Sequence, residues 1–169
     1  GGIPKVIGSV TGNIKKITVN NDEINSGTQQ LVDGIISSVN KQLAAAGAGF
    51  SITEENYSAQ IAAGLKSIEA GIKQCEEAIK QYEAAGQTAS EAYKAAVKKR
   101  AELMAQLGML SGIKDQLDAI AKYHRGVKAY TGAVSQLEKG IKESKEIQTL
   151  EKGAEAVANG SGRLAEGIS

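Results

Sequence analysis

The chain has 169 residues, a formal net charge of +1 and only 4% aromatic residues, with no tryptophan and a single cysteine. The near-neutral charge gives no electrostatic reason to expect a nucleic acid or an anionic membrane surface as a partner. The single cysteine excludes an internal disulfide and a zinc site built from cysteines. No apolar run approaches the roughly 20 residues that a membrane-spanning helix needs.

In chain order, residues 1–21 carry glycine, threonine and asparagine and predict an irregular lead-in. Asn21 or Asp22 is suited to cap a first helix at 22–46. Gly47 ends that helix, and a capping box at Ser51 and Glu54, with Thr53 as an alternative cap, starts a second helix at 53–85. Thr88 opens a third helix at 89–123. The apolar pattern slips near residue 126, which indicates a stagger in the seam or a short turn, and a fourth helix covers 133–168.

The composition predicts an all-α domain over 22–169, because alanine, lysine, glutamate, isoleucine and leucine dominate the middle of the chain. Helices of about 30 residues are roughly 45 Å long. Short connections between long helices imply antiparallel neighbours. The expected architecture is an elongated antiparallel helical bundle or coiled coil of three to four long helices.

A short phrase, a large apolar residue followed three positions later by glycine, recurs at seven-residue intervals. Such a spacing places the apolar residues along one stripe of a helix. Glycine costs roughly 1 kcal/mol against alanine inside a helix, so its repetition implies close approach of another helix. The predicted helix-packing seam comprises Gly27, Leu31, Gly34, Gly64, Gly71, Leu137, Gly140, Leu150, Gly153, Gly160, Leu164 and Gly167.

Glycine gives way to alanine from Ala78 onward and returns after residue 126. We therefore expect the closest contact to lie between the N-terminal and C-terminal tracts, with Gly27, Gly34, Gly153 and Gly160 in or near it. On this hypothesis, replacing Gly34 or Gly153 by leucine lowers the melting temperature.

No residue pattern predicts catalysis, a cofactor or a metal ion. His124 is the only histidine and has no obvious acidic partner in sequence, so it is interpreted as a surface or seam residue. Cys75 occupies an anchor position of the repeat and is interpreted as a small buried apolar residue. The basic run at 98–100 indicates a solvated helix face. We expect the chain not to be an enzyme.

The phrases at Ile24, Leu31, Leu137, Leu150, Val157 and Leu164 resemble the X-X-X-Leu-X-X-Gly heptad repeat of bacterial surface proteins. The segment 39–57 resembles a junction in the YhgE/Pip (phage infection protein) family, where one helix ends and a Thr-x-x-Asn-Tyr segment opens the next. The related EsaA/YueB proteins of type VII secretion and some MMPL-type transporters are also similar. The resemblance covers both ends and residues 39–71, whereas 88–122 reads as generic helix.

The resemblance implies a soluble piece from the extracytoplasmic region of a membrane-anchored, Gram-positive protein. The expected role is a stalk or docking surface at the cell surface whose partner is a protein: phage, a secretion component or a second copy. No nucleic-acid partner is expected. The alternatives are a cytosolic coiled-coil adaptor that dimerises through the same seam, and a membrane-active helical-bundle toxin.

Overall fold

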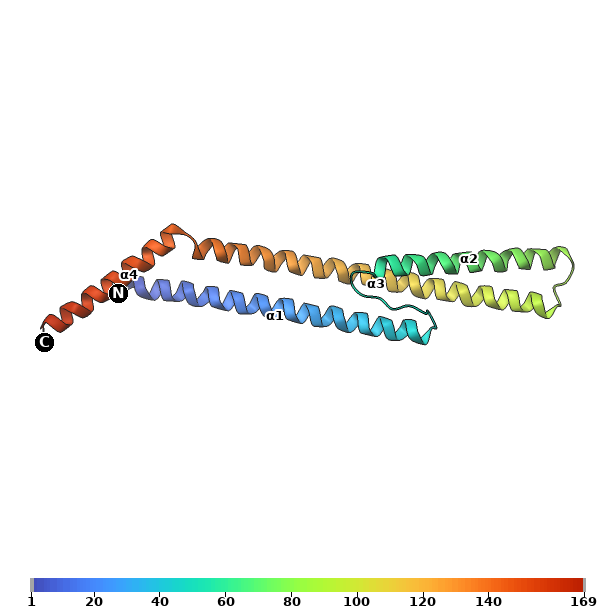
Figure 1. Ribbon diagram of the computed structural model, residues 1–169, viewed down its shortest axis with the longest axis horizontal. Helices are drawn as coiled ribbons and strands as arrows, with labels where there is room; N and C mark the ends of the chain where they lie inside the picture. The colour runs from blue at the N-terminus through green and yellow to red at the C-terminus, as the bar shows by residue number, and fades with distance from the viewer. Residues whose placement is uncertain (1, 169) are drawn as a thin grey trace. The chain divides into compact units, whose positions relative to one another are not determined.

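A computed structural model describes the backbone of residues 2–168 and the side chains of residues 8–144 and 146–162. Over this range the chain forms four α-helices and no strand. They are α1 (Gly2–Ala45), α2 (Tyr57–Ala84), α3 (Glu91–Lys142) and α4 (Lys145–Ile168) (Figure 1). The chain is therefore all-helical. No helix in the described part combines the length and apolar character that crossing a membrane requires.

The first helix begins much earlier than the sequence pattern predicts. Residues 2–21 are helical and belong to α1, so the expected irregular lead-in is wrong. Gly8 and Gly12 weaken local helix propensity, but Ile14 is buried and the Thr18 side chain bonds to Glu138 of α3. Packing against α3 thus outweighs the propensity of the lead-in.

Glycines with positive φ end α1 and α2. Gly47 and Gly49 have φ of 69° and 73°, and Gly86 has φ of 68°, a region that residues with a Cβ rarely adopt. The second and third helices begin at Tyr57 and Glu91, later than the predicted starts at 53 and 89. Thr53 and Asn56 exchange two side chain–backbone hydrogen bonds just before α2, and the Ser90 hydroxyl accepts the Tyr93 N–H at the start of α3.

The third helix continues through the predicted break near residue 126. It ends at Lys142 instead, and α4 begins at Lys145. Buried positions on α3 recur every seven residues without a slip, at Leu110, Leu117, His124, Thr131 and Glu138. The last three of these residues are polar. A search for apolar residues alone therefore misses them and predicts a slip of the heptad near residue 126. The helix itself keeps its phase.

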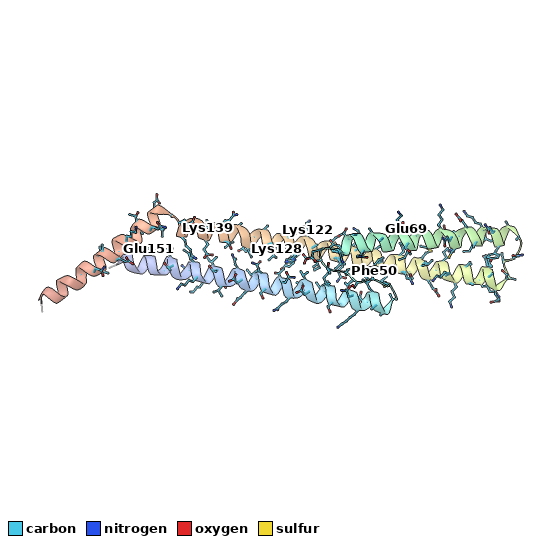
Figure 2. The ribbon with its side chains drawn as sticks, in the orientation of Figure 1. Phe50, Glu69, Lys122, Lys128, Lys139 and Glu151 are labelled. Carbon is cyan, nitrogen blue, oxygen red and sulfur yellow. The ribbon has the colours of Figure 1, made fainter. Side chains whose placement is uncertain are left out.

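The chain divides into two compact units. Unit 2, residues 30–123, comprises the end of α1, all of α2 and the first part of α3, and it holds the apolar core. Phe50, from the segment between α1 and α2, packs against this core, whereas Glu69 lies on the exposed side of α2 (Figure 2). The buried core residues are Val39, Leu43, Ile52, Tyr57, Ile61, Leu110, Ile113, Leu117 and Ala121.

Unit 1 comprises residues 1–29 and 124–169. Here the first part of α1 and the last part of α3 run antiparallel, side by side (Figure 1). The start of α4 lies against the N-terminal part of α1, where Val10, Ile14, Ile147 and Leu150 line a common hollow. The interface between α1 and α3 is unusually polar, and it positions the candidate site.

Candidate interaction surface

Three side-chain contacts set the register of α1 against α3 in unit 1. The Thr18 hydroxyl donates to the Glu138 carboxylate, and the Asn21 amide lies 3.4 Å from the Ser135 hydroxyl. The Thr131 hydroxyl donates to Asn25 Oδ1 at 2.8 Å. Each step forward along α1 is matched by the same step back along α3, so all three contacts describe one antiparallel register.

Three of these polar residues are buried: Asn21, Thr131 and Glu138. Asn21 is only 5% exposed and also donates to the Thr131 carbonyl oxygen at 3.1 Å. Glu138 is 9% exposed and accepts from Lys142 Nζ at 2.8 Å. The Lys142 ammonium and then the Thr18 hydroxyl hold the pKa of Glu138 below its ordinary value, because both stabilise the carboxylate.

One side of the α1–α3 pair is defined by residues that precede the interface positions. On α1, Ile17, Asn20, Ile24 and Gly27 each come one residue before Thr18, Asn21, Asn25 and Thr28. On α3, Tyr130 and Leu137 each come one residue before Thr131 and Glu138. One residue is a rotation of about 100° around a helix. In an antiparallel pair, rotation in the same sense brings both sets to the same side.

This side, together with Gly126, Ala133 and Gly140 at its α3 edge, is called the apolar side of unit 1. These glycines share a helix face with the large residues because positions three apart are neighbours. None of these residues is charged; the nearest charges on α1, Lys16 and Glu23, lie at its rim. The large side chains are uncovered: Ile17 is 39% exposed, Ile24 40%, Tyr130 61% and Leu137 65%.

The glycines of the apolar side leave space beside these large residues. A Cβ built on Gly27, Gly126 or Gly140 meets nothing within 4 Å. Exposed apolar patches of a few hundred Å² on a single chain are commonly functional. A surface of large apolar residues separated by open glycine positions is suited to receive another helix.

The opposite side of the pair is polar. Residues that follow the interface positions by one include Asp22, Gln29, Arg125 and Lys139. A shallow hollow on this side is lined by Asn25, Gln29, His124, Lys128, Thr131, Gly132 and Ser135. The two sides of the same helix pair therefore differ sharply in character.

The predicted seam residues fall into two groups. Gly64 and Gly71 lie where α2 meets α3: a Cβ on Gly64 stands 3.0 Å from Leu110 Cδ2, and one on Gly71 stands 3.0 Å from Leu103 Cδ1. The other glycines with a described surrounding meet nothing within 4 Å of a Cβ. These are Gly27, Gly34, Gly140, Gly153 and Gly160.

The expectation of a close contact through Gly27, Gly34, Gly153 and Gly160 is therefore corrected for the single chain. Leu31, Leu137 and Leu150 are 49%, 65% and 43% exposed. The physical reason is rotational: α1 buries Thr28 and Val32, each one residue beyond a position of the repeat. The repeat consequently lies on the flank of the buried stripe. The side chain of Leu164 and the surroundings of Gly167 lie outside the described residues.

The structure also shows how exposed the other residues singled out in the sequence are: His124, Cys75 and the basic run at 98–100. His124 is 3% exposed, within the α1–α3 interface, and so is not a surface residue. Cys75 is half-buried on α2, and Lys98 and Lys99 are exposed. In the described part of the chain, no three His, Cys, Asp or Glu side chains gather in a way that could hold a metal ion.

Sequence reasoning missed the polar interface positions. Asn21, Thr28, Thr131 and Glu138 are buried, although their residue types usually predict exposure. Their signal is spacing: Ile14, Asn21 and Thr28 are seven residues apart, as are His124, Thr131 and Glu138.

Comparison with family models, curated proteins and solved structures gives no significant match for this chain.

Proposed function

We propose that the chain is a non-enzymatic helical interaction domain, part of the extracytoplasmic region of a bacterial membrane protein similar to YhgE/Pip. In this role its helices form an elongated antiparallel bundle, a stalk that presents a docking surface to another protein. The observation that carries the proposal is the apolar side of unit 1. It displays Ile24 with Gly27 and Leu137 with Gly140, two copies of the repeat on which the resemblance rests.

Two further features support a docking role. The polar α1–α3 interface sets the register without using the large apolar residues of the repeat, which stay available to a partner. The open glycine positions carry a cost in helix stability of roughly 1 kcal/mol each, and no contact among the described residues accounts for that cost at Gly27 or Gly140. A surface that receives a partner supplies the missing reason.

Location is tested in cells of the organism that encodes the chain. Lys99→Cys on a Cys75→Ser background, with any cysteine outside this chain also replaced, provides one exposed thiol in the full-length protein. A membrane-impermeant maleimide is expected to label this thiol in intact cells. Labelling only after lysis would contradict an extracytoplasmic position and favour a cytosolic coiled-coil adaptor. A cytosolic protein of known exposed thiol serves as the control for cell integrity.

A further inference from the structure

We infer that the apolar side of unit 1 is a self-association surface that receives the same side of a second copy of this chain. The inference rests on the proposed function as an interaction domain and names the partner of that surface. Its starting point is that the described single chain leaves four large apolar residues uncovered on one uncharged side.

Symmetry supplies the arrangement. A two-fold axis parallel to the helices places α1 of one copy against α3 of the other. The facing helices are then antiparallel, as they are within one chain, and the result is a four-helix bundle in which each helix has two antiparallel neighbours. Such an axis leaves each residue at its own level along the helices, so the register within the chain also sets the register between chains.

That register pairs large residues with small ones. Within the chain, Thr18 lies opposite Glu138 and Asn25 opposite Thr131. Across the two-fold axis and within one residue of this register, Ile17 is level with the partner's Gly140, and Ile24 with the partner's Ala133. Tyr130 is level with the partner's Gly27. The open space at Gly27 and Gly140 thereby accepts the large side chains of the second copy.

The size of the surface decides how strong the association is. From Ile17 to Gly27 on α1 the surface is about 15 Å long, and from Gly126 to Gly140 on α3 it is about 21 Å long. Helix widths of about 9 Å give roughly 300 Å² per copy. Joining two such surfaces buries about 600 Å², well below the approximately 1,200 Å² of stable complexes. The expected dimer is weak and depends on protein concentration.

Sedimentation equilibrium of the purified chain tests the inference between about 1 µM and about 1 mM, the range of weak complexes. The weight-average mass is expected to rise from 17.5 kDa towards twice that value. Gly27→Leu fills the space that receives Tyr130 of the second copy. This variant is expected to keep the chain monomeric, because its affinity for a second copy falls at least tenfold. Leu137→Lys is expected to do the same by placing a charge on the surface.

Gly132→Leu is the matched control. Gly132 is also a helical glycine with nothing within 4 Å of a Cβ, but it lies on the polar side. This variant is expected to associate like the unmodified chain, and circular dichroism shows that all variants keep their helices. A monomer at every concentration overturns the inference, and so does equal association of Gly27→Leu and Gly132→Leu.

Cross-linking checks which helices meet. Two chains are prepared on the Cys75→Ser background, one with Gly27→Cys and one with Tyr130→Cys. A short bismaleimide reagent is expected to join unlike chains more than like chains, because α1 faces α3 of the partner. A predominance of like-chain products overturns this arrangement. These results are independent of maleimide labelling in cells, so a monomeric chain that is labelled in intact cells would reject the dimer and leave the proposed function standing.

Discussion

Asn21 and Thr131 are joined by a buried hydrogen bond of 3.1 Å from the Asn21 amide to the Thr131 carbonyl oxygen, although 110 positions separate them in the sequence. The carbonyl belongs to the backbone of α3, so the contact holds one level of α1 against one level of α3. A buried polar residue at such a position specifies register in paired helices. It also turns the large apolar residues of the repeat towards the flank.

Asn21→Ala is expected to lower the free energy of unfolding by about 1 to 2 kcal/mol, because a buried hydrogen bond and its packing are lost. Asn20→Ala, at the neighbouring exposed position, makes the same change in helix propensity without that loss. Urea unfolding of both variants in dilute solution measures the difference. Equal stability of the two variants would show that Asn21 does not hold the register.

Gly64→Leu is expected to destabilise the chain by about 1 to 3 kcal/mol, because a Cβ there already stands 3.0 Å from Leu110 and 3.3 Å from Phe50. Gly34→Leu makes the same exchange where a Cβ meets nothing within 4 Å. This variant is expected to raise the melting temperature, since leucine is more favourable than glycine in a helix by up to about 1 kcal/mol. Thermal unfolding compares them. A greater loss of stability in Gly34→Leu would restore the contact originally expected there.

Tyr57→Phe is expected to lower stability by about 1 kcal/mol, because the buried ring stays while its hydroxyl no longer donates to Asp118 Oδ1 at 2.8 Å. The loss is moderate because Asp118 keeps its ion pair with Lys114 at 2.8 Å. Tyr123→Phe, on a ring that is 53% exposed, is the control. Denaturant unfolding is the measurement, and a stability loss no larger than that of the control would contradict the prediction.

Glu138 is expected to make stability depend on pH in the acid range. Its pKa is lowered in the folded chain by Lys142 and Thr18, so its contribution is present at neutral pH. That contribution is lost as pH falls below about 4.3, the ordinary glutamate value, towards the folded pKa. Glu138→Gln is expected to flatten this part of the profile.

Urea midpoints recorded between about pH 7 and pH 3 test the role of Glu138 across the titration range of carboxylates. Glu143→Gln is the control, because its carboxylate forms an exposed ion pair with Lys139 at 3.9 Å. The expected profile for this control matches that of the unmodified chain. An acid-range loss that persists unchanged in Glu138→Gln would assign the pH dependence to other carboxylates.

Local signals in the sequence predicted several features well. The loss of helix at Gly47 was predicted because glycine enters the left-handed region at no steric cost. The second helix and most of the third were predicted from their apolar spacing. The predictions failed where an interface is polar: Thr18 and Asn21 read as an irregular lead-in, and His124, Thr131 and Glu138 read as a slip. An apolar count cannot detect an interface whose contacts are hydrogen bonds.

By itself the sequence determined that the chain is helical and that a large-apolar-x-x-Gly repeat runs along its helices, because propensity and seven-residue spacing are local properties. Only the tertiary structure decided which way the repeat faces. A helix rotation of about 100° separates a buried stripe from its flank, and a one-residue offset in sequence produces it. The hydrogen bond from Asn21 to the Thr131 carbonyl oxygen, across 110 positions, contributes to selecting that rotation. The rotation leaves Ile24 and Leu137 on the uncovered side.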